Sequence, residues 1–150
     1  MTRAREAKVR TLQRKMMRIV VGTKRIAHDG DLENWVDYVI RSTRAAEKVM
    51  TDLGQPDWVE EVHRRRFQWA GRTARLNDNR WTREVLVWSA TGNRKRGRPK
   101  ARWTDQLNKF FRRELQATNQ FWMEIASEEA SWASLENDYV NFALGMLSEV

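Results

Sequence analysis

Apolar residues recur at intervals of three and four along most of the chain, a spacing that predicts amphipathic helices. The strongest stripe of this kind covers residues 32–53, with Asp31 in position to cap its start and Gly54 to end it. A shorter stripe, with basic residues between its apolar positions, runs over residues 9–19 and precedes Gly22. No segment alternates between apolar and polar residues as a strand does. The sequence therefore predicts an all-α fold of five to seven amphipathic helices with one long basic loop.

The middle of the chain carries further helix signals. Asp57 is a candidate cap for a helix that continues to Leu76, and Thr82 is a candidate cap for a short helix after it. Pro99 suits the first turn of another helix, in which Trp103 is the first apolar anchor. On the helix that follows Asp57, the side expected to be buried carries Trp58, Val62, Trp69 and Thr73.

The C-terminal segment from Trp122 onward has apolar residues at helical spacing, and Ser131 is available as an internal cap if the segment forms two helices. The long polar, glycine-bearing segment from Ser89 to Arg98 is predicted to be a loop. The expected organisation is a helical part over residues 1–88, a basic loop over 89–98 and a second helical part over 99–150. A chain of this length can bury a core of ordinary size, so we expect these parts to form one domain, 1–150, with two small helical lobes as the alternative.

Charge is unevenly distributed along this pattern. Sixteen of the 28 Lys and Arg residues lie between residues 63 and 113, against three acids, which gives that block a net charge of +13. Residues 1–25 carry +8, whereas 26–62 and 114–150 carry −6 and −7. A block this basic keeps a positive field beside acidic neighbours, so it predicts a polyanionic partner.

Two compact motifs lie inside the basic block, over residues 67–76 and 96–105, and both mix basic side chains with aromatic and apolar ones. This mixture is typical of a folded nucleic-acid surface. The segment 96–100, Arg-Gly-Arg-Pro-Lys, resembles the core of an AT-hook, which inserts into the minor groove. General phosphate contact needs only charge and reach, and we favour it. The candidate nucleic-acid-binding residues are Arg64, Arg65, Arg66, Arg72, Arg75, Arg94, Lys95, Arg96, Arg98, Lys100 and Arg102.

Four tryptophans in the same block offer two interpretations. Trp69, Trp81, Trp88 and Trp103 could stack on unpaired bases. Their placement at helical spacing favours core packing for most of them, because aromatic residues on an apolar stripe usually serve the interior.

Catalytic and metal-binding patterns are missing from the sequence. The chain has no cysteine, and His28 and His63 lack neighbours at a telling spacing, so neither a metal nor another cofactor is expected. The acidic cluster Asp29, Asp31 and Glu33 lies at a predicted helix start, where acids cap free N–H groups. No phosphate-binding loop or nucleophile elbow is present. We therefore expect a binding protein rather than an enzyme.

No apolar run reaches the roughly 20 residues of a membrane helix, and no secretory signal is recognisable at the N-terminus. The expected location is nuclear or cytoplasmic, neither secreted nor in a membrane.

The order of the motifs resembles a known family. The resemblance rests on a basic helix ending in Ile19-Val20-Val21-Gly22, then Arg64 to Arg75, then Gly97 to Asp105, then Trp122 with Ala126, Trp132 and Leu135. It is similar to the C-terminal tail that follows the polymerase domain in LINE-like, non-LTR retrotransposon endonuclease/reverse transcriptases, and it spans about residues 9–142. The chain departs from the family pattern in two places: Arg72 stands where the family usually has His, and the pair Glu128-Glu129 stands where it usually has Asp-Arg.

The resemblance implies a parent enzyme that nicks target DNA and copies its own RNA onto the nicked end, an RNA-directed DNA polymerase with an endonuclease. This chain matches neither the polymerase's Tyr/Phe-x-Asp-Asp motif nor a nuclease core. The implied role is a non-catalytic tail that holds template RNA or target DNA by phosphate contacts beside an upstream polymerase domain. The alternative is a free-standing helical DNA-binding or chromatin adaptor, with an AT-hook-like loop on DNA and acidic helices on protein partners.

Overall fold

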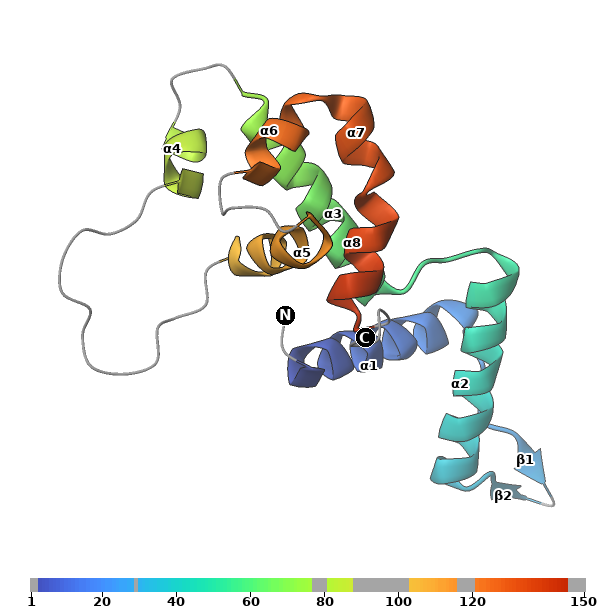
Figure 1. Ribbon diagram of the computed structural model, residues 1–150. Coiled ribbons are helices and arrows are strands. Elements are labelled where there is room, and N and C mark those ends of the chain that lie inside the picture. Colours follow the sequence, from blue (N-terminus) through green and yellow to red (C-terminus); the bar gives the residue numbers. More distant parts are fainter. Residues whose placement is uncertain (1–2, 29, 77–80, 88–102, 116–120, 146–150) are drawn as a thin grey trace, which may run out of the picture. The chain divides into compact units, whose positions relative to one another are not determined.

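The computed structural model describes residues 3–28, 30–76, 81–87, 103–115 and 121–145 (Figure 1). The fold is all-α, as the sequence predicts, apart from one short hairpin. In chain order the elements are α1 (Arg3–Val21), β1 (Ala27–His28), β2 (Asp31–Leu32), α2 (Trp35–Asp52), α3 (Trp58–Ala74), α4 (Trp81–Val87), α5 (Asp105–Leu115), α6 (Phe121–Ser127), α7 (Glu129–Ser134) and α8 (Glu136–Ala143).

The chain divides into two compact units, residues 1–61 and 62–150. This division falls inside α3, whereas the sequence places boundaries around a loop at 89–98. That loop lies outside the described residues.

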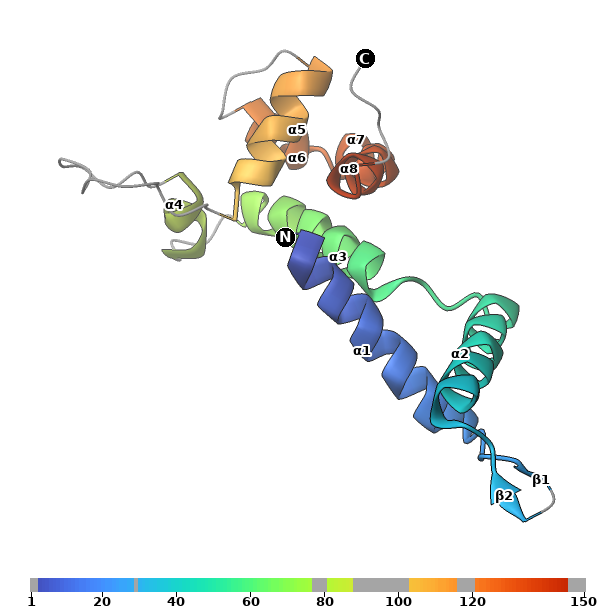
Figure 2. The same cartoon turned by 90° about the horizontal axis from the view of Figure 1, so that it is seen from below.

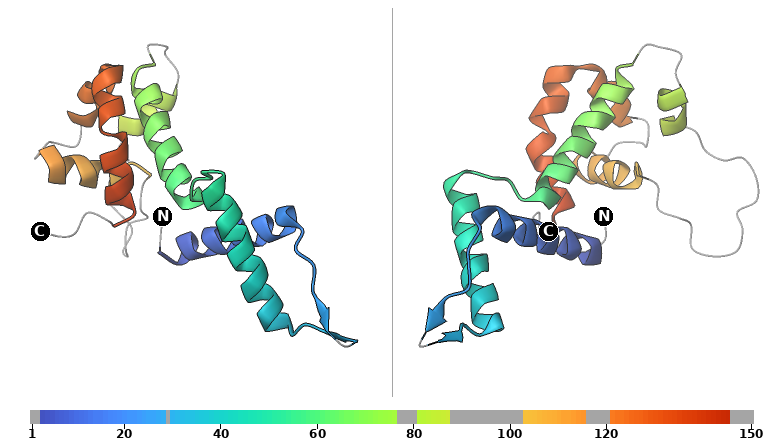
Figure 3. Two further views of the ribbon diagram at one scale, coloured as in Figure 1. Left: turned by 90° about the vertical axis from the view of Figure 1, so that its right-hand side faces the viewer. Right: turned by 180° about the vertical axis from the view of Figure 1, so that it is seen from behind.

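The first unit pairs α1 with α2, and the hairpin β1–β2 lies at the N-terminal end of α2 (Figure 3). The hairpin is antiparallel, with Ala27 opposite Leu32 and His28 opposite Asp31. Gly22 ends α1 at a φ of 65°, a left-handed conformation that suits glycine, and confirms the predicted stop. The second predicted stop, Gly54, has a φ of 60°.

The expected cap of α2 is wrong. Asp31 is paired in β2, and the helix begins three residues after the hairpin, where Asn34 Oδ1 accepts a hydrogen bond of 2.8 Å from the Val36 N–H. The neighbouring Glu33 does not cap the helix either. Its carboxylate accepts hydrogen bonds of 2.9 and 2.7 Å from the Arg41 guanidinium, which lowers the pKa of Glu33 to about 2. Glu33 thus connects the start of α2 to Arg41 within the helix, and Asp29 lies outside the described residues.

The first unit buries small and polar side chains between its helices. Gln13 is buried on α1, where its side chain donates to the Pro56 carbonyl at 2.9 Å and accepts from the Trp58 N–H at 3.0 Å. Ser42 and Ala46 are the buried residues of α2. The large apolar residues of both stripes are mostly exposed: Leu12, Met16, Ile19 and Val20 on α1, and Trp35, Val36 and Ile40 on α2. The strongest hydrophobic stripe in the sequence is therefore not the main core.

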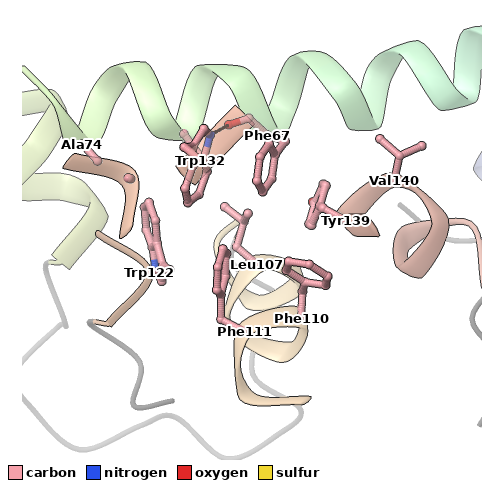
Figure 4. Close-up of a cluster of buried hydrophobic side chains, with 11 residues drawn as sticks. Phe67, Ala74, Leu107, Phe110, Phe111, Trp122, Trp132, Tyr139 and Val140 are labelled. Carbon is pink, nitrogen blue, oxygen red and sulfur yellow. Dashed lines mark hydrogen bonds between the residues drawn. The ribbon is translucent and has the colours of Figure 1, made fainter. Parts of the chain in front are cut away.

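The main core lies in the second unit, where α5 and the segment α6–α8 pack on one side of α3 (Figure 2). At its centre, the Trp132 indole stacks on Phe67 with ring centroids 4.1 Å apart and donates to the Phe67 carbonyl at 3.1 Å (Figure 4). Gly71 lies one turn further along α3, and a Cβ there would overlap the Trp132 indole. Phe111 of α5 stacks on the same indole at 5.5 Å. Aromatic stacking across three helices therefore holds this unit together.

The buried side of α3 differs from the prediction. Of the four residues expected there, only Thr73 is buried, while Trp58, Val62 and Trp69 are exposed. The buried side instead carries Val59, His63, Phe67, Ala70, Gly71, Thr73 and Ala74. Small residues on this side let Trp132 approach the helix backbone, which larger side chains would prevent. Asp57 does cap α3, since its carboxylate accepts from the Val59 N–H at 2.9 Å.

Three further local features differ from the sequence prediction. The helix α4 begins at Trp81, so Thr82 lies inside it instead of capping it. Trp103 precedes α5, which begins at Asp105, so it is not an anchor within that helix; Pro99 lies outside the described residues. The C-terminal segment forms three short helices with breaks at Glu128 and Leu135, and Ser131 lies within α7. Its hydroxyl donates to the Glu128 carboxylate at 2.8 Å.

Candidate nucleic-acid interface

Five arginines of the basic block lie on or just after α3, and no acidic residue occurs between positions 62 and 77. A helix turns by about 100° per residue, so these arginines point in different directions. Three of them hold α3 to neighbouring helices, and two lie on the exposed side.

The first of the holding arginines is Arg64, whose Nη1 lies 3.7 Å from the Glu136 carboxylate of α8. Next, Arg66 donates to the Gln106 side chain at 3.0 Å, and its guanidinium lies 5.9 Å from the centroid of the Trp103 ring. Both residues are half-buried. Their guanidinium groups therefore contribute to packing within the unit, in addition to any contact with a ligand.

The third holding arginine is Arg75. It donates to the Ala126 carbonyl at 3.0 Å and lies 3.5 Å from the Glu129 carboxylate. Glu129 belongs to the pair Glu128-Glu129, where the resemblance to reverse transcriptase tails leads one to expect Asp-Arg. In this chain the acid at that position is the ion-pair partner of Arg75.

The exposed side of α3 carries Arg65, Trp69 and Arg72, at relative positions i, i+4 and i+7. Residues at these spacings share one helix face, which we call the outer face. Arg72 is exposed and has neither an ion pair nor a hydrogen bond within the described residues. Trp69 is 46% exposed, and its ring meets the Trp103 ring edge-on, with centroids 4.8 Å apart and an interplanar angle of 69°. The outer face thus combines two guanidinium groups with an accessible indole.

The structure resolves the tryptophan alternatives one by one. Trp103 is half-buried and packs against the core, in agreement with the core prediction. Trp69 and Trp81 are 46% and 82% exposed, so core packing is wrong for these two. Trp88 lies outside the described residues. Among the described residues, the tryptophans buried in the core are Trp122 and Trp132, which lie outside the basic block.

The remaining site predictions concern residues 94–102. The candidates Arg94, Lys95, Arg96, Arg98, Lys100 and Arg102 lie outside the described residues, as does the AT-hook-like segment they form. They stay predictions from sequence.

A second charged region lies in the first unit, around a hollow of about 310 Å³ beside α1 and α2. Its arginines are already paired: Arg10 contacts Asp57 at 2.6 Å, and Arg14 contacts Glu47 at 3.0 Å. Two cations matched by two anions leave little field for an anionic ligand. The outer face is the stronger candidate, because Arg72 there is exposed and has no ion-pair partner within the described residues.

Within the described residues no group of three or more His, Asp or Glu side chains is placed to hold a metal ion. None of the described helices is long and apolar enough to cross a membrane. No known protein family, curated protein or solved structure matches this chain. The likeness to reverse transcriptase tails thus stays a prediction from the sequence.

Proposed function

We propose that this chain binds nucleic acid through the phosphate backbone and does not itself catalyse a reaction. The observation that carries the proposal is the outer face of α3, where Arg65 and Arg72 flank an exposed indole in a stretch without acids. Arginine suits this role because its planar guanidinium donates two parallel hydrogen bonds to phosphate oxygens. The cluster at 94–102 adds six cations close behind in sequence.

In this proposal the chain acts as the tail of a LINE-like reverse transcriptase and holds template RNA or target DNA beside an upstream polymerase domain. The motif over residues 67–76 supports a division of labour: Phe67 and Gly71 serve the core, while Trp69 and Arg72 remain accessible. Arg72, which departs from the family's His, keeps a cation on the outer face. The departure therefore leaves the proposed phosphate contact intact.

The test compares binding to single-stranded RNA, duplex DNA and nicked duplex of equal length at one salt concentration, followed by a salt titration. We expect little sequence preference and a slope of log K against log salt of about −4 to −8, from about 0.7 to 0.9 per neutralised phosphate. Replacing Arg65 and Arg72 with Gln should flatten the slope by up to about 2. The matched control replaces Lys109 and Arg112, two exposed cations of α5, and should change the slope less. A slope near zero for the wild-type chain would refute the proposal.

The adaptor is a second candidate function, and the exposed apolar residues of α1 and α2 favour it. A face of several large apolar side chains is typical of a protein-interaction surface. A polymerase domain could equally cover this face in the tail proposal. Extending the gene upstream separates the two: an adjoining polymerase reading frame supports the tail, and its absence supports the adaptor.

A further inference from the structure

We propose that Trp69 is a stacking platform for an unpaired nucleobase, so that the outer face of α3 binds single strands in preference to duplexes. This inference rests on the proposed nucleic-acid binding and adds the class of ligand. In a duplex both faces of each base are covered by neighbouring bases, whereas an unpaired base can place one face on an indole.

The exposure of Trp69 is the first observation. A tryptophan on a helix usually turns to the core, and α3 has a well-filled core side on which Phe67 and Ala70 are fully buried. Trp69 lies on the other side and keeps 46% of its surface exposed. It therefore presents ring surface to solvent outside the aromatic core.

The second observation is that the ring has a support. Trp103 meets it edge-on at 4.8 Å, and Trp103 is itself held by core contacts and by the Arg66 guanidinium at 5.9 Å. A side chain fixed before binding loses less rotamer freedom when the ligand arrives. The indole is thus preorganised, unlike an isolated surface tryptophan.

The third observation is the charge on either side. Arg65 lies one turn before Trp69 and Arg72 one turn after it, about 6 Å and 4.5 Å along the helix axis. A cation on each side can contact the phosphates that flank a stacked nucleotide, which is the combination found in sequence-tolerant single-strand binding sites. Base stacking and phosphate contact then act on the same short stretch of strand.

The experiment measures the affinity of the full chain for a single-stranded oligonucleotide and for a duplex of the same length, at fixed salt. We expect Trp69→Leu to weaken single-strand binding by at least about fivefold, since loss of one stacked base reduces affinity by about 5- to 150-fold. Duplex affinity should stay within about twofold. Trp69→Phe keeps a ring and should fall between wild type and Trp69→Leu, which separates stacking from loss of apolar bulk.

Trp35 provides the matched control. Like Trp69 it is exposed, at 62%, and meets a neighbouring ring, that of Tyr38 at 5.4 Å, but it lies in the acidic block on α2, so Trp35→Leu should leave both affinities unchanged. If Trp69→Leu binds single strands as wild type does, or weakens single strand and duplex equally, the stacking proposal is overturned while nucleic-acid binding stands. If the wild-type chain binds neither the single-stranded oligonucleotide nor the duplex, the proposed function itself fails. The thermal unfolding midpoint of each variant shows whether the fold is retained, and Trp69→Phe decides if Trp69→Leu unfolds.

Discussion

Gly71 occupies a helix position where any side chain would meet the Trp132 indole. Glycine within a helix is normally about 1 kcal/mol less favourable than alanine, so Gly→Ala often stabilises a helix. Here we expect the reverse: Gly71→Ala should lower the free energy of unfolding by about 1–3 kcal/mol, as overpacking in a core does. Urea denaturation measures it, with the adjacent exposed Arg72→Ala expected within about 0.5 kcal/mol of wild type. A Gly71→Ala protein more stable than wild type would contradict the close approach of Trp132.

Tyr139 is fully buried, and its hydroxyl has no hydrogen-bond partner within the described residues. Burial disfavours the phenolate and raises its pKa to about 12, from 10.0. The contribution of the neutral Tyr139 side chain to the free energy of unfolding is therefore fully present below pH 10. It is lost as the pH rises toward 12. We expect Tyr139→Phe to be neutral or up to about 1 kcal/mol more stable at pH 7. Its advantage should widen between pH 10 and 12 in urea denaturation at each pH. If Tyr139→Phe is instead less stable than wild type by the same amount at every pH, the Tyr139 hydroxyl is hydrogen-bonded in the folded protein.

The aromatic residues of α3 show why the sequence does not predict which side of this helix is buried. Both sides of α3 carry aromatic or apolar residues, Trp69 on one side and Phe67 on the other, so periodicity alone cannot tell which side is buried. The deciding feature is the small surface at Ala70 and Gly71, which admits Trp132 from 61 residues further along the chain. That contact depends on tertiary packing, and local spacing does not contain it.

The start of α2 gives a matched pair of substitutions at the scale of one element. Asn34 caps the helix through the Val36 N–H, whereas Asp31 is exposed in β2. We expect Asn34→Ala to cost about 1 kcal/mol, a typical loss for a cap, and Asp31→Ala to cost less than about 0.5 kcal/mol. Hydrogen exchange of the α2 amides measures this change in the local stability of the first unit. Equal effects of the two substitutions, or a larger effect of Asp31→Ala, would restore Asp31 as the cap.

Element ends were predictable where one residue decides them. Gly22, Gly54 and Asp57 act through their own backbone or side-chain geometry, and all three predictions are confirmed. Asp31 and Ser131 are also good cap residues by type, yet strand pairing places the first in a hairpin and a helix break places the second inside α7. The helical periodicity predicted the all-α class because it averages over many residues, whereas a cap depends on a single register.

The basic block of the chain was predictable from the sequence, but the roles of its individual arginines were not. The basic block was predictable because charge is additive along the sequence. The structure divides its described arginines further: Arg64, Arg66 and Arg75 contact neighbouring helices, while Arg65 and Arg72 lie on the outer face. Composition cannot make that division, since it depends on which acids and carbonyls other helices bring near.

The two units should also differ in stability. The aromatic core, with Phe67, Trp132 and Tyr139 at its centre, lies wholly in the second unit, whereas α1 and α2 enclose mainly Gln13 and small side chains. Local unfolding free energy follows buried apolar contact, so amides of α1 and α2 should exchange faster than those of α3 and α5. Hydrogen exchange followed by mass spectrometry measures this difference. We expect Phe67→Ala, at about 3–5 kcal/mol, to abolish protection in α3 and α5 and to change α1 and α2 less. Equal protection in both units, lost together in Phe67→Ala, would show instead that the chain unfolds as one cooperative body.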